Sequence, residues 1–129
     1  MKKVIILILC LVTLIGFILL VSIQGNPFSD GDILGCIEPV DFERLDKMID
    51  TVSNGKKCSE TFTRPGFEGS EFKTIITYNG SKIKLTYIVP AQETQKGSTA
   101  KATFDKIYKV GTEYHLKNKS IDIRLDSTY

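Results

Sequence analysis

The sequence lacks most of the side chains on which enzyme chemistry depends. It has no tryptophan, one histidine (His115) and three cysteines, none of them in a Cys-x-x-Cys pair. A catalytic dyad or triad built on histidine would have to use His115, and so would a histidine-ligated zinc site. That residue alternates with Tyr114 and Leu116 in an expected strand, so we expect its side chain to face solvent. No catalytic or metal-binding residues are predicted, and the chain is interpreted as a non-enzyme.

Signals for cofactors and nucleic acids are also missing. Gly31 and Gly35 lack the strand-to-helix context of a phosphate-binding loop, so no cofactor is predicted. Of the 17 lysines and arginines, Lys2 and Lys3 lie at the N-terminus, and the remaining 15 balance the 15 acidic residues. A neutral domain with scattered lysines is not a nucleic-acid-binding pattern. Acidic residues dominate 24–71 and basic residues dominate 72–129, which indicates either ordinary surface solvation or two faces of opposite sign.

One long apolar run is present, from Val4 to Ile23, with no charged residue. A helix of that length rises about 30 Å, the thickness of the hydrocarbon core of a bilayer. A signal peptide has a shorter apolar core of about 7–15 residues, followed by a small-x-small cleavage site. The exit at 21–26 has no Ala-x-Ala sequence. A retained transmembrane signal-anchor is therefore favoured, and a secreted protein with a cleaved signal peptide is the alternative.

Basic residues around the run predict its orientation. Lys2 and Lys3 precede it, whereas the first basic residue after it is Arg44. The positive-inside rule then places the N-terminus in the cytoplasm. The predicted organisation is a cytoplasmic N-terminus (1–3), a transmembrane span (4–23), a linker (24–37) and an exported α+β domain (38–129). The predicted location is the cell (inner) membrane, single-pass, with the C-terminal domain periplasmic or extracellular.

The cysteines divide between membrane and exported part. Cys10 lies in the apolar run, whereas Cys36 and Cys58 follow it. In an oxidising compartment two such thiols favour one disulfide, here closing a loop of about 20 residues worth roughly 3 kcal/mol. The two cysteines flank an expected helix, so the chain must fold back to bring them together.

Hydrophobic periodicity predicts one helix and then strands. Phe42, Leu45, Met48, Ile49 and Val52 recur at helical spacing, after a first-turn proline and before Asn54-Gly55. From residue 60 the apolar residues alternate instead. Expected strands cover 61–63, 72–78, 82–89, 102–110, 114–116 and 121–125. Asn79-Gly80 predicts a tight hairpin between the second and third of these, with positive φ at both residues.

The predicted fold class is therefore α+β, with one helix packed on a four- or five-stranded antiparallel sheet. The element order resembles the cystatin-like or NTF2-like class in outline, in which a helix lies across a curved meander. No motif accompanies this resemblance, and it implies nothing about activity. Asn79-Gly80-Ser81 and Asn118-Lys119-Ser120 match the glycosylation acceptor pattern, in a chain whose isoleucine, lysine and threonine content indicates an AT-rich, often bacterial genome.

Binding remains as the expected activity. Loops at 64–70 and 90–99 are long enough to present a surface, with Arg64, Phe67, Gln92, Glu93, Gln95 and Lys96 as candidate contact residues. We expect a single-pass membrane protein whose small extracytoplasmic domain acts by protein–protein contact, for example as an inhibitor or immunity protein. The alternative is an accessory or assembly subunit of an envelope complex. The expected partners are the membrane and an envelope protein.

Overall fold

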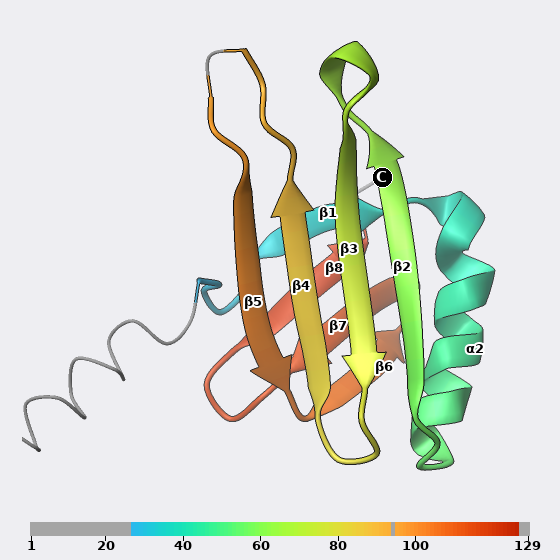
Figure 1. The fold of residues 1–129 in the computed structure, drawn as a ribbon. Coiled ribbons are helices and arrows are strands. Elements are labelled where there is room, and N and C mark those ends of the chain that lie inside the picture. The colour runs from blue at the N-terminus through green and yellow to red at the C-terminus, as the bar shows by residue number, and fades with distance from the viewer. Residues whose placement is uncertain (1–26, 94, 127–129) are drawn as a thin grey trace, which may run out of the picture.

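A computed structural model of the chain describes residues 27–93 and 95–126, so the expected span at 4–23 lies outside the described residues. Within them, no helix is long and apolar enough to cross a membrane. The described part is a small α+β fold with one α-helix and two four-stranded sheets (Figure 1). Its elements are β1 (Ile33–Ile37), the 3-10 helix η1 (Pro39–Asp41), α2 (Phe42–Ser53), β2 (Cys58–Pro65), the 3-10 helix η2 (Phe67–Gly69), β3 (Glu71–Tyr78), β4 (Ile83–Val89), β5 (Ser98–Phe104), β6 (Lys106–Val110), β7 (Glu113–Lys117) and β8 (Asp122–Asp126).

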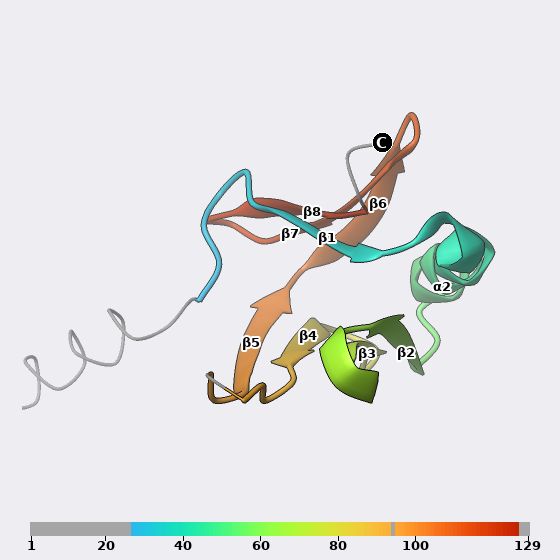
Figure 2. The same ribbon diagram turned by 90° about the horizontal axis from the view of Figure 1, so that it is seen from above.

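The two sheets form two layers, seen edge-on in Figure 2. One sheet has the order β2-β3-β4-β5 and is antiparallel throughout. The other has the order β1-β8-β7-β6, in which β1 runs parallel to β8. Helix α2 lies along one side of the two layers, near β2 and β6, and does not lie across a single meander. The core between the layers is apolar and includes Ile37, Leu45, Phe62, Ile76, Ile83, Leu85, Phe104, Tyr114, Leu116, Ile123 and Leu125.

A bend at Asp105 explains why there are two sheets and not the predicted single one. Residues 98–110 run almost continuously as strand, but β5 pairs with β4 and β6 pairs with β7. The Asp105 amide donates to the Lys117 carbonyl at 2.8 Å, and its carboxylate forms an ion pair with Lys82. The chain thus passes from one layer to the other at a polar corner, as in packed sheets whose strands change layer.

The predicted helix is confirmed as α2, with Leu45 and Met48 buried. The predicted hairpin is confirmed as β3 and β4. Its turn differs in one respect, since Gly80 has φ of 95° but Asn79 does not have a positive φ. Asn79 acts through its side chain, whose carbonyl oxygen accepts from the amides of Ser81 and Lys82 at 2.9 and 2.8 Å. Such an Asx turn closes the loop without a left-handed asparagine.

The structure differs from the predicted linker over 27–37. Phe28 is 8% exposed and belongs to the core. Strand β1 pairs with β8, and the amide of Asp122 donates to the Asp30 carboxylate at 2.8 Å. Turn-forming residues predicted a linker from which Phe28, Ile33 and Leu34 could pack back onto the domain, and the fold provides apolar partners for Phe28 and β1. The folded domain therefore begins at least ten residues before position 38.

Cys36 and Cys58 carry free thiols, which differs from the predicted disulfide. The buried Cys36 thiol donates to the Leu125 carbonyl at 3.5 Å and also hydrogen-bonds the Thr74 side chain. Thr74 lies opposite Phe62 on β2, and Cys58 comes four residues before Phe62 on that strand. Four strand residues span about 13 Å, whereas the Cα atoms of bonded cysteines lie about 5.5 Å apart. The strand register therefore keeps the two thiols apart.

Candidate functional site

Two loops emerge at the same end of the β2-β3-β4-β5 sheet, at the top of Figure 1. They are the β2–β3 connection (66–70) and the β4–β5 connection (90–97), and we call them together the loop end. Because antiparallel strands alternate in direction, these two connections must emerge at the same end of the sheet. The sequence predicted both loops as candidate binding surfaces, and the topology places them side by side.

The β2–β3 connection is tightly closed at its base. The Gly66 amide donates to the Ser70 carbonyl at 2.8 Å. A Cβ at Gly66 would lie 2.9 Å from the Ser70 hydroxyl oxygen and 3.1 Å from the Phe72 ring, so any larger residue would push these side chains away. Within the loop, exposed Glu68 has φ of 59°, the one positive φ of a non-glycine residue in the described part of the chain. Backbone strain of this kind costs about 1 kcal/mol or more and occurs preferentially at functional positions.

The β4–β5 connection is closed in a similar way. Gln92 and Gln95 exchange two backbone hydrogen bonds, of 2.8 and 3.1 Å. At the base, a Cβ on Gly97 would lie 2.9 Å from both the Ala91 nitrogen and the Val89 carbonyl oxygen. Both atoms belong to the backbone, so this position has no room for a side chain. Backbone contacts therefore hold both loops in shape before any partner arrives, which lowers the entropy lost on binding.

The predicted contact residues differ in their positions. Glu93, Gln95 and Lys96 are exposed in the β4–β5 connection, where Gln92 is half-buried. Phe67 lies in η2, in the other connection.

Arg64 does not belong to the loop end. It lies within β2, its guanidinium donates to the Gly35 carbonyl at 2.9 Å, and it stacks over the Phe72 ring at 5.0 Å. Arg64 therefore links β2 to β1. The sequence placed it in a loop because Pro65 was expected to end the strand, but β2 continues to Pro65. Glu68, by contrast, was not selected from the sequence. A glutamate rarely adopts positive φ, and residue type alone gives no signal of it.

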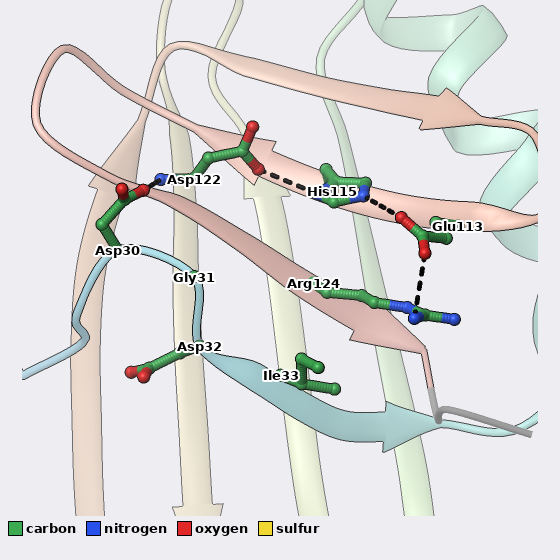
Figure 3. A pocket seen from close by; sticks show the side chains of 8 residues that line it. All are labelled: Asp30, Gly31, Asp32, Ile33, Glu113, His115, Asp122 and Arg124. Atoms are coloured by element: carbon green, nitrogen blue, oxygen red, sulfur yellow. Dashed lines mark hydrogen bonds and ion pairs between the residues drawn. The ribbon is translucent and has the colours of Figure 1, made fainter.

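His115 lies at the centre of a second polar cluster, on the outer face of the β1-β8-β7-β6 sheet (Figure 3). Its Nδ1 is 2.8 Å from an Asp122 carboxylate oxygen, and its Nε2 is 3.0 Å from Glu113. Glu113 also pairs with Arg124 at 3.0 Å. The Tyr108 ring stacks on the imidazole at 5.1 Å, and its hydroxyl donates to Asp122. The side chain points outward as predicted, but neighbours cover it to 18% exposure.

The polar groups of this cluster bind one another. A hydrogen bond to Asp122 raises the pKa of Tyr108 to about 12, so the phenol remains a proton donor. Burial raises the pKa of Asp122, but hydrogen bonds from Tyr108 and His115 outweigh it and hold the pKa below its usual value. Both imidazole nitrogens face carboxylates, so neither is directed at a substrate. An open hollow of about 280 Å³ beside the cluster is lined by Asp30, Gly31, Asp32, Ile33, Glu113, His115, Asp122 and Arg124, without a hydroxyl or thiol nucleophile. The described part of the chain contains no group of three residues suited to hold a metal ion.

Comparison of the chain with models of protein families, with curated proteins and with solved structures finds no match. The loop end is therefore the candidate functional site on geometry alone.

Proposed function

We propose that this chain is a single-pass membrane protein whose extracytoplasmic domain binds another envelope protein through the loop end, as an inhibitor or immunity protein does. The span is the apolar run at 4–23, and the two lysines before it orient the domain outward. The binding step is protein–protein contact, without a catalytic role for the domain.

One observation supports the choice of surface above the others. Glu68 is held in a strained backbone conformation in a loop closed by Gly66, and its exposed carboxylate forms no ion pair with the described residues. A strained and preformed group at a protruding end is suited to contact a partner.

Site-specific photo-crosslinking in native membranes tests this proposal. The full chain carries a photoreactive residue at Glu93 or Gln95, or, as a matched control, at exposed Thr112 in the turn between β6 and β7. We expect a discrete heavier adduct from the loop-end positions and none from the control. Glu68→Lys should reduce the adduct about tenfold or more, the loss expected for a central contact residue. Adducts of equal yield from all three positions would contradict the proposal.

Export of residues 27–129 behind a cleavable signal separates an inhibitor from an accessory subunit. An inhibitor needs only its binding domain and should retain the loop-end adduct when it is soluble. A subunit held by lateral contacts of the span should lose the adduct.

A further inference from the structure

Twelve side chains on the outer face of the β2-β3-β4-β5 sheet form a regular array, which we call the threonine–lysine face. These positions alternate with core residues such as Phe62, Ile76 and Leu85, so they point away from the core. The strand register arranges them in three cross-strand rows, Ser59–Thr77–Lys84–Thr103, Thr61–Ile75–Thr86–Lys101 and Thr63–Lys73–Ile88–Thr99.

The chemistry of these twelve positions is uniform, and acidic Glu71, paired with Pro65, lies one row further toward the loop end. The threonine–lysine face carries seven hydroxyl groups and three ammonium groups, and none of its twelve residues is acidic or aromatic. Lys73, Lys84 and Lys101 form no ion pair within the described residues, unlike Lys82, which pairs with Asp105 beside the face. With neighbouring strands about 4.8 Å apart and rows about 6.7 Å apart, the three lysines lie roughly 8–14 Å from one another. Ammonium and hydroxyl donors spread over such an area match several phosphate groups at once.

The short segment between the apolar run and the folded domain limits how far the threonine–lysine face can lie from the bilayer. The apolar run ends at Ile23, and Phe28 is already buried in the core. Five residue steps span at most about 18 Å, so an anchored domain cannot leave the bilayer surface. In both Figure 1 and Figure 2 the described chain begins beside β5, the strand that brings Lys101 to the face.

We propose that the threonine–lysine face lies against the anionic phospholipid headgroups of the membrane in which the chain is anchored. The inference rests on the anchoring span of the proposed function, but it uses a surface other than the loop end. Electrostatic attraction acts within a Debye length of about 8 Å, and the short tether keeps the face within reach of that zone. Ile75 and Ile88 are half-buried, so the contact is made at the headgroups without insertion. Each lysine near an anionic surface contributes about a fivefold preference for the bound orientation.

Tryptophan fluorescence in reconstituted vesicles tests the orientation. The full chain has no tryptophan, so Thr86→Trp places a single fluorophore at the centre of the face. Val110→Trp is the matched control, at a 55% exposed position on β6 in the other sheet. Each variant is reconstituted in phosphatidylcholine vesicles with and without phosphatidylglycerol, and brominated lipid serves as the quencher.

We expect quenching of Thr86→Trp only with phosphatidylglycerol, and no quenching of the Val110→Trp control. High salt should relieve the quenching. Lys73→Glu, Lys84→Glu and Lys101→Glu together should lower the preference of the anchored domain for the face-bound orientation about a hundredfold, which is measured as loss of quenching. If the triple variant fails to fold, the comparison of vesicles with and without phosphatidylglycerol still tests the role of charge in the unsubstituted face.

Three results would overturn the inference. Equal quenching of both tryptophan positions would show no preferred face, and quenching that ignores phosphatidylglycerol would remove the role of charge. An unquenched Thr86→Trp in a chain that remains with the vesicles after an alkaline wash would overturn the orientation alone. Loss of the chain in that wash would overturn the span as well, and with it the anchored part of the proposed function.

Discussion

At the scale of single residues, Asp126 has a structural role that alternation did not predict. Apolar residues alternate at 121–125, and Ile123 and Leu125 lie in the core, so the same alternation would direct Asp126 to solvent. Asp126 is nevertheless 2% exposed. Its carboxylate accepts the Tyr114 amide at 2.8 Å and pairs with Arg124 at 2.9 Å. The Asp126 carboxylate thus accepts the hydrogen bond of a β7 backbone amide. The sequence could not indicate this, because the contact exists only once β7 and β8 are paired.

Asp126→Asn should therefore destabilise the domain by about 2–3 kcal/mol, the cost of weakening charge-assisted hydrogen bonds at a buried site. Urea unfolding followed by circular dichroism measures the change. Glu43→Gln, at a side chain 83% exposed, is the matched control and should change stability by less than about 0.5 kcal/mol. Equal effects of the two substitutions would show that Asp126 is not held as described.

Acid should unfold the domain through Asp122 and Asp126. Burial acts to raise the pKa of each carboxyl, but hydrogen bonds, from Tyr108 to Asp122 and from Arg124 to Asp126, hold both pKa values below the usual one. A carboxyl with a lowered folded-state pKa stabilises fully above its unfolded value, near 3.9, and this stabilisation is lost as pH falls through the folded value. Unfolding free energy should thus be steady from about pH 7 to 5 and fall below about pH 4. Asp122→Asn should flatten the fall, and an unchanged slope would contradict this.

The thiols of Cys36 and Cys58 should differ in reactivity. Burial raises the pKa of Cys36 to about 11 and also raises the pKa of the more exposed Cys58. Alkylation of the folded chain without reductant, read by intact mass, should modify Cys58 slowly and leave Cys36 untouched until denaturant is added. A mass two hydrogens lighter, with neither thiol labelled until reduction, would show that the disulfide predicted from the sequence forms after all.

At the scale of elements, local signals predicted α2 and the β3–β4 hairpin, because a 3.6-residue period and an Asn-Gly turn depend on neighbours in sequence. The full length of β2, the strand character of β1 and the division of the β-part into two sheets were missed. Each of these depends on partners far along the chain: β1 pairs with β8, and the division follows from the corner at Asp105. The loop end was found as two loops, but its closed bases and the strained Glu68 were not, since they arise from the backbone path.

The closed base of the β4–β5 connection can be tested with Gly97→Ala. The added methyl group would contact two backbone atoms at 2.9 Å, so the loop must shift, at a cost of about 1–3 kcal/mol. Thermal unfolding measures the loss. Ala91→Ser, an exposed change in the same loop, is the control and should have little effect. An unchanged midpoint for Gly97→Ala would show that the loop is not held in this shape.

At the scale of the whole molecule, the first described strand completes the second sheet. A chain that begins at residue 38 lacks both Phe28 and β1 and leaves one edge of β8 without a partner. We expect residues 27–129 to unfold cooperatively with denaturant and residues 38–129 to show no cooperative transition, by circular dichroism at matched concentration. Equal unfolding midpoints for the two chains would show that the folded domain begins at residue 38, as predicted from the sequence.

The pairing of β1 with β8 also sets an order in time. Ile33 pairs with Arg124, near the far end of the chain, and the N-terminal strand has no partner in its sheet until that segment has been synthesised. Residues are delivered from the N-terminus at about 5–20 per second, so the ribosome releases most of the domain seconds before its last partner appears. Contacts this distant in sequence also form slowly. For the export that we propose, this order keeps the domain incomplete during translocation, which suits passage through a narrow channel, and the domain closes only after β8 has crossed.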